Sequence, residues 1–213
     1  MKGDLVLKDL IVLVADQDIE FSVRGLLSRH RAIGSRKLTK GKYDIYRHLE
    51  HDPGCLQDSH NFLRPFINQY AHALVIFDRE GCGKDDLSRG DLENLVEKQL
   101  SINGWGDRAA TIVLDPELEV WVWSESPHVD AMLGWKGKQP DLITWLVEQG
   151  FKEANEAKPN RPKEAVEEAL RIARKAKSAS LYRQLAKRVS LKKCIDPAFD
   201  KFKAIMQTWF PEE

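Results

Sequence analysis

The sequence predicts an α/β fold: a mostly parallel central sheet flanked by helices, with a helical C-terminal extension. Three short apolar runs each end in acidic residues, and segments with helical spacing separate them. Continuous apolar runs of this length are typical of buried parallel strands, whereas one-sided antiparallel strands alternate. Beyond a polar linker at residues 152–161 the pattern is helical. We therefore expect an α/β domain over residues 1–150 and a helical extension over residues 151–213 that packs on it.

Composition places the chain among ordinary globular proteins. Hydrophobic residues make up 42% and charged residues 31%, and the 33 basic residues balance 33 acidic ones. The three cysteines (Cys55, Cys82 and Cys194) are an odd, scattered set, which favours a reducing compartment over a disulfide framework. Acids interrupt the start, unlike a signal peptide, and no apolar run is long enough to cross a membrane. We expect a cytoplasmic protein without membrane association.

The first apolar run, residues 10–15, leads into Asp16-Gln17-Asp18 and then into helical spacing from Glu20 to Arg29. Asp18 is a plausible N-cap, with Glu20 in the first turn where the helix dipole favours negative charge. Strand, acidic turn and helix would also place these carboxylates at the carboxyl edge of a sheet.

Basic residues without acids follow between residues 29 and 42. They are either a solvated strand and turn or an edge that contacts phosphates, and phosphate contact there would use Arg36, Lys37, Lys40 and Lys42.

Residues 43–70 look helical in two pieces, broken at residues 52–54 (Asp-Pro-Gly). A histidine- and cysteine-rich group lies in this part of the chain, at His48, His51, Cys55 and His60. Its spacing fits none of the common structural zinc patterns, so polar-face and loop roles are the simpler interpretation.

The second apolar run, residues 73–77, stops at Asp78-Arg79-Glu80 before two glycines. Ligands of open α/β sheets bind beyond the carboxyl ends of the strands. If the strand persists, Asp78 and Glu80 project the same way and can share one hard cation such as Mg²⁺ or Mn²⁺. The alternative is a well-solvated turn.

The third apolar run, residues 109–114, is followed by Asp115-Pro116-Glu117. Aspartate, proline and glutamate in this order are typical of a helix start. Alternation over residues 118–123 would also suit a strand, but we favour the helix. In either case Glu117 and Glu119 follow a buried strand, and the nearby tryptophans are expected in the core.

A short helix over residues 141–149 and a polar linker over 152–161 precede three helices at 162–177, 181–189 and 198–209. These helices hold a run of basic residues without acids between residues 170 and 195. The run is either a solvated face or a nucleic-acid contact. A contact would use Arg171, Arg174, Lys175, Arg183, Lys187 and Arg188.

This layout resembles the Toprim domain of topoisomerases, primases and overcoming-lysogenization-defect nucleases. It is more closely similar to the Toprim-related family called domain of unknown function 4276, often found beside bacterial phage-defence genes. The resemblance rests on LVADQDIEFSVRGLL (13–27), ALVIFDREG (73–81), LDPELEVWVWSES (114–126), and SLYRQLAKRVSL (180–191) with DPAFDKF (196–202).

The resemblance implies residue roles. Asp78 and Glu80 match a magnesium-binding acidic pair, and Glu119 matches the glutamate of a Glu-x-Trp motif. Where the family usually has Glu-Gly after the first strand, this chain has Ala15-Asp16. The general acid or base would then be Asp16 or Glu20, with Glu119 as a further catalytic residue. Glu119 or Asp16 would also help Asp78 and Glu80 to bind the metal ion.

Two functions follow from the resemblance. The first is a magnesium-dependent nuclease or phosphotransfer subunit of a bacterial anti-phage defence system, acting with other proteins of that system. The second is a catalytically inactive subunit that binds nucleic acid or protein. A weaker resemblance, of VLVADQD to the start of a phosphoacceptor receiver domain with Asp78 as acceptor, also implies magnesium. The long interval between Asp16 and Asp78 disfavours it.

Overall fold

A computed structural model of the chain describes residues 7–124 and 126–212. Residues 1–6 of the expected first domain, and Glu125 in the third quoted motif, lie outside this description. The four strands of the described sheet are β1 (Lys8–Val14), β2 (Tyr43–Arg47), β3 (Tyr70–Asp78) and β4 (Ala109–Leu114). All neighbouring strands run parallel, in the order β2-β1-β3-β4. The predicted α/β class with a parallel sheet is therefore confirmed.

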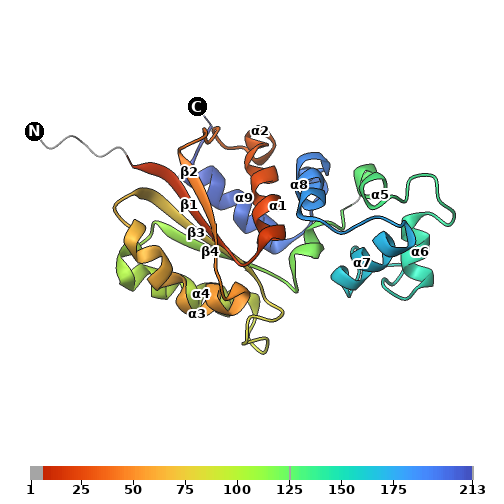
Figure 1. Cartoon of the computed structure of the whole chain (residues 1–213), viewed down its shortest axis with the longest axis horizontal. Helices are drawn as coiled ribbons and strands as arrows, with labels where there is room; N and C mark the ends of the chain where they lie inside the picture. The colour runs from red at the N-terminus through yellow and green to blue at the C-terminus, as the bar shows by residue number, and fades with distance from the viewer. Residues whose placement is uncertain (1–6, 125, 213) are drawn as a thin grey trace, which may run out of the picture.

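Helices cover both faces of the sheet. Those of the described chain are α1 (Gln17–Leu27), α2 (His30–Ile33), α3 (His51–Leu63), α4 (Arg89–Leu100), α5 (Pro127–Leu133), α6 (Leu142–Glu148), α7 (Pro162–Ile172), α8 (Ala179–Arg188) and α9 (Pro197–Trp209). Short helical turns lie at Arg64–Phe66 (η1), Ser101–Trp105 (η2), Leu118–Trp121 (η3) and Leu191–Lys193 (η4). Helices α3 and α4 pack on one face, and α1 and α9 on the other (Figure 1). The expected helical C-terminal region is present.

The sheet core consists of the three predicted apolar runs. Val12 of β1 pairs with Leu74 of β3, and Phe77 of β3 pairs with Val113 of β4; all four side chains are inaccessible to solvent. A strand covered on both faces has no side to turn toward water, which explains why these runs lack alternation. Helix α9 returns to pack near β4, and α8 packs on α1. Helices α5, α6 and α7 lie to the right in Figure 1, beyond the carboxyl ends of the strands.

Two sequence predictions about local structure are wrong. Residues 43–47 form strand β2, not a helix, and only Ile45 of this strand is buried. The Asp-Pro-Gly sequence at 52–54 lies inside the first turns of α3, where proline is tolerated because its missing N–H has no helical partner. An edge strand with one buried side chain carries too little periodicity to be recognised.

The predicted helix start at Asp115 is also wrong. The Asp115 carboxylate accepts a hydrogen bond from Arg79 Nε at 2.7 Å instead of capping a helix, and the chain forms only the η3 turn. The N–H of Leu118, at the beginning of that turn, donates to Asp78 Oδ1 at 2.9 Å. Trp121 and Trp123 are buried, as expected.

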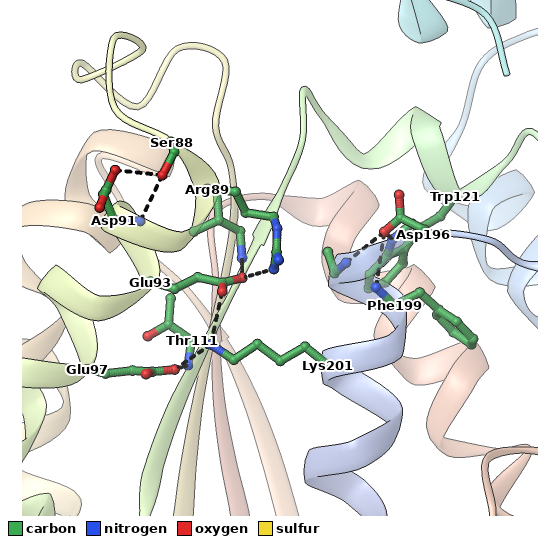
Figure 2. Close-up of polar contacts among 12 residues, drawn as sticks. Ser88, Arg89, Asp91, Glu93, Glu97, Thr111, Trp121, Asp196, Phe199 and Lys201 are labelled. Atoms are coloured by element: carbon green, nitrogen blue, oxygen red, sulfur yellow. Dashed lines mark hydrogen bonds and ion pairs between the residues drawn. The ribbon is translucent and has the colours of Figure 1, made fainter. Parts of the chain in front are cut away.

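Carboxylates of α4 cover the exposed edge of the sheet (Figure 2). Glu97 Oε1 accepts the N–H of Thr111 at 2.9 Å, and Glu93 Oε1 accepts the N–H of Val113 at 3.1 Å. Lys201 of α9 then binds both glutamates, at 3.0 Å and 2.8 Å. The outward-facing N–H groups of Thr111 and Val113 are therefore unavailable for pairing with another strand.

Candidate functional site

The crevice between the carboxyl ends of β1 and β3 is the topological switch point of the sheet. These strands are neighbours, yet the chain leaves β1 for β2 on one side and leaves β3 for β4 on the other. Open α/β sheets bind ligands at such a point because the diverging connections leave a crevice there. Asp16 lies two residues beyond the end of β1 and Asp78 is the last residue of β3, so both predicted site residues lie at this switch point.

Asp78 is held by backbone hydrogen bonds on both sides. Its carboxylate accepts the N–H of Leu118, and its own N–H donates to Asp52 Oδ1 at 2.8 Å. Burial, reinforced by the charges of Asp52 and Glu119, raises the pKa of Asp78 well above its usual value. Burial is likewise the main cause that raises the pKa of Asp52. Several carboxyl groups thus share one poorly solvated region.

Asp16 and Asp18 form the β1 side of this region. Asp16 is the N-cap of α1, because its Oδ1 accepts the N–H of Ile19 at 2.8 Å; the prediction that Asp18 is the cap is wrong. Asp18 instead lies in the first turn and is half-buried. Burial and, next, the charge of Asp16 raise the pKa of Asp18 to about 6.

Glu117 and Glu119, both buried, form the β4 side, and the C-terminal region supplies their partners. Glu119 Oε1 accepts the hydroxyl of Tyr182 at 2.5 Å and lies 3.2 Å from Lys177 Nζ. Glu117 accepts the backbone N–H of Lys163 at 3.1 Å and pairs with its Nζ at 3.3 Å. Burial and the neighbouring Glu119 still raise the pKa of Glu117.

The other two predicted site residues lie apart from Asp78. Glu80 is exposed in the turn after β3, where its N–H donates to the carbonyl of Pro116 at 3.0 Å. Glu20 binds Arg24 at 2.8 Å and Arg47 at 3.3 Å, on the side of α1 that faces β2. The structure therefore brings together Asp16, Asp78 and Glu119, and leaves Glu20 and Glu80 at the margins.

The carboxylates are close enough to affect one another electrostatically without converging on a point. Over residues 7–124 and 126–212, no group of three or more His, Cys, Asp or Glu side chains is arranged to hold a metal ion. This includes the histidine- and cysteine-rich segment. There His48 Nδ1 accepts the N–H of Glu50 at 3.1 Å, His51 Nδ1 lies 3.2 Å from the carbonyl of Ala15, and Cys55 is fully buried.

Comparison with known proteins identifies no relative. The chain matches no protein-family model, no curated protein and no solved structure. The Toprim-like interpretation therefore stays a prediction from the sequence motifs.

The two predicted basic surfaces occupy different places. Arg36 and the lysines up to Lys42 precede β2, at the amino end of the sheet, about 20 Å along the strands from the acidic crevice. Arg36 is already paired with Asp9 at 3.1 Å. In the C-terminal run, Arg171 pairs with Glu168, Lys175 Nζ donates to the carbonyl of Met132, and Arg188 contacts the Met132 sulfur. Exposed side chains of that run include those of Arg174, Arg183 and Lys187.

Sequence reasoning missed the C-terminal contributors to the crevice, Lys163, Lys177 and Tyr182, and also Asp52. The signal for Asp52 was present, because aspartate followed by proline is typical of a first helical turn. No local pattern distinguishes Lys177 from the other basic residues of its segment. Among the described residues, no helix combines the length and apolar character that crossing a membrane requires.

Proposed function

We propose that this chain is a Toprim-like subunit of a bacterial anti-phage defence system, and that it performs divalent-cation-dependent hydrolysis or transfer of phosphodiesters. The supporting observation is the gathering of Asp16, Asp78 and Glu119 at the switch point, where burial and mutual repulsion raise the pKa of Asp78. The defence setting rests on the resemblance of the motifs alone.

The carboxylate side chains of the site are of the chemical type that binds a hard cation. Asp78 and Glu119 would hold Mg²⁺ or Mn²⁺ with help from Asp16, since carboxylate oxygens are the ligands that these ions prefer. A cation would also neutralise the negative charge that raises the pKa of Asp78. Because the carboxylates do not converge, Glu119 would have to exchange its contact with Lys177 for the cation. Glu80 is exposed in the turn after β3, so it could contribute only at the outer edge of the site.

A bound Mg²⁺ or Mn²⁺ would supply Lewis-acid polarisation of the phosphodiester. The protein itself provides positively charged side chains at the same place. Lys163 and Lys177 come from the C-terminal region and lie beside Glu117 and Glu119, where an ammonium group can stabilise the negative charge that develops on a phosphate. The folding of the C-terminal region against η3 is therefore part of the site.

The test is hydrolysis of labelled DNA, RNA and dinucleotide substrates with Mg²⁺ or Mn²⁺. We expect Asp78→Asn to lose activity by about 100-fold or more while remaining folded, because the carboxamide still accepts the N–H of Leu118. Asp107→Asn, an exposed aspartate before β4 at the amino end of the sheet, is the matched control and should retain activity. Hydrolysis by Asp78→Asn at the rate of the unmodified protein would exclude the proposal.

A specific observation favours a second candidate, a non-catalytic binding subunit. Lys163 and Lys177, which are exposed to solvent, already pair with the buried carboxylates of Glu117 and Glu119, as in an ordinary ion-pair network. A cation that binds only the folded state must raise the melting temperature. If saturating Mg²⁺ and Mn²⁺ leave the melting temperature unchanged, the binding subunit is favoured over the enzyme.

A further inference from the structure

An open groove of about 820 Å³ adjoins the acidic crevice on the β2 side. The beginning of α1 forms one wall with Asp16, Asp18 and Glu20. The end of β2 forms the other with Tyr46 and Arg47, and the segment leading into α3 closes it with His51. Asp16 lines this groove and belongs to the proposed site, so a phosphodiester chain lying in the groove would meet that site at Asp16.

His51 has an unusual backbone conformation in this groove. Its φ angle is +51°, in the left-handed region that non-glycine residues seldom occupy. His51 is the first residue of α3, and its N–H donates to the carbonyl of His48 at 3.2 Å, which helps to hold this conformation. Uncommon conformations of this kind persist where the surroundings impose them, and they concentrate at functional sites. Here the conformation brings the imidazole to the end of β1.

The contact of the imidazole with Ala15, the residue after β1, defines its tautomer. His51 Nδ1 lies 3.2 Å from the carbonyl oxygen of Ala15. A carbonyl oxygen only accepts hydrogen bonds, so Nδ1 carries the proton, and in the neutral ring Nε2 keeps its lone pair. Over the described part of the chain, Nε2 of His51 makes no hydrogen bond to protein, and the residue is exposed.

Two of the three carboxylates that line the same groove are already engaged. Asp16 caps α1 through Oδ1, and Glu20 binds two arginines. Glu119, at the far side of the crevice, accepts the Tyr182 hydroxyl and pairs with Lys177. His51 therefore offers an oriented proton acceptor with a free nitrogen, and its position is fixed by a hydrogen bond on the other side of the ring.

We propose that His51 is a catalytic residue, the general base for phosphodiester hydrolysis at this site; this inference rests on the proposed function. Nε2 of His51 accepts a proton from the attacking water. The water oxygen forms a bond to phosphorus as the bond from phosphorus to the leaving oxygen breaks. The leaving oxygen then takes a proton from solvent, and the imidazolium returns its proton to solvent, so the protein is unchanged after each turnover.

The variant for the test is His51→Asn, because asparagine tolerates the left-handed conformation and so preserves the entry into α3. We expect its hydrolysis rate at saturating metal to fall by about 100-fold, the usual contribution of a general base. Added imidazole should restore at least part of the rate to His51→Asn and none to Asp78→Asn. His30→Asn, in α2 at the amino end of the sheet, is the matched control and should match the unmodified protein.

A second measurement does not depend on activity. Nitrogen-15 NMR of the metal-free protein should show His51 protonated at Nδ1 in its neutral form, whereas His51 protonated at Nε2 would overturn the inference. So would full activity of His51→Asn while Asp78→Asn is inactive, a result that leaves the proposed function intact. Loss of activity in His51→Asn without rescue by imidazole would assign His51 a structural role and overturn the inference too. An unmodified protein without hydrolytic activity would overturn both proposals.

Discussion

Asp52 Oδ1 accepts the backbone N–H of Asp78 at 2.8 Å, which ties the first turn of α3 to the last residue of β3. Burial and, next, the charge of Asp52 raise the pKa of Asp78. Burial also raises the pKa of Asp52, although the hydrogen bond from the Asp78 N–H lowers it. This hydrogen bond holds Asp78 and Asp52 together, whereas the negative charges of the two carboxylates repel each other. The site is thus held by backbone geometry against electrostatic repulsion.

Replacing Asp52 separates these two effects. Asp52→Ala leaves the N–H of Asp78 without its acceptor, so we expect the free energy of unfolding to fall by about 1–3 kcal/mol. Asp52→Asn keeps a carbonyl acceptor and removes a poorly solvated charge, so it should be at least as stable as the unmodified protein at pH 7.5. Urea unfolding of both variants provides the measurement. Equal destabilisation by the two substitutions would show that the charge itself stabilises the fold.

Asp18 makes stability dependent on pH. Its pKa is raised from 3.8 to about 6, so ionisation is harder in the folded state than in the unfolded state. Below the unfolded-state pKa, Asp18 is protonated in both states and the folded protein has its full stability. As the pH rises toward 6, the unfolded state ionises more readily than the folded state, so stability is lost. Asp18→Asn lacks this loss. Its stability relative to the unmodified protein should increase by about 1 kcal/mol between pH 4 and pH 7, a value reduced for partial exposure. Urea unfolding across that range would reveal a constant difference if the expectation is wrong.

Gly25 permits the close packing of α1 on α8. A Cβ atom at this position would lie 2.7 Å from the Cβ of Ala186 and 2.8 Å from the backbone oxygen of Arg183. Because backbone cannot yield easily, Gly25→Ala should cost about 1–3 kcal/mol of stability. Gly90→Ala in α4 is the matched control: its Cβ would meet only Ser88 Oγ, at 3.9 Å, and better helix propensity should leave stability equal or higher. Thermal unfolding distinguishes the two; similar melting temperatures would disprove the packing argument.

Lys201 compensates the glutamates that cover the β4 edge. Glu93 is almost fully buried, so loss of one cation leaves it short of a partner, although Arg89 remains 2.7 Å away. We expect Lys201→Met to lower the unfolding free energy by about 2 kcal/mol, less than for an ion pair broken completely. Lys98→Met, on the exposed face of α4, should change it by less than about 0.5 kcal/mol. A harmless Lys201→Met would mean that Arg89 alone satisfies Glu93.

Elements with strong local signals were predictable from the sequence. The cores of β1, β3 and β4 are covered on both faces, so each reads as an apolar run without alternation. The start of α9 was predictable because Asp196 accepts the N–H groups of Ala198 and Phe199 in the way an N-cap does. In these cases the neighbouring residues alone supply the hydrogen bonds and the hydrophobicity.

The three Asp-Pro pairs show where local reasoning stops. Residues 196–197 begin α9 and residues 52–53 lie at the start of α3, whereas residues 115–116 begin no α-helix. The difference is a partner distant in the sequence. Arg79 donates a hydrogen bond to the Asp115 carboxylate, and the Asp78 carboxylate accepts the N–H of Leu118. The same dipeptide therefore has different structures because tertiary contacts compete for its capping groups.

By itself the sequence determined the α/β class, the buried strands and the acidic residues that follow them, because apolar runs and capping residues act over a few neighbouring positions. Only the tertiary structure decided which acids meet. The parallel order β2-β1-β3-β4 brings Asp16 beside Asp78 and leaves Glu80 outside. Lys177 and Tyr182 reach Glu119 from about sixty residues away. Such pairings depend on strand order and helix packing, which spacing along the chain does not encode.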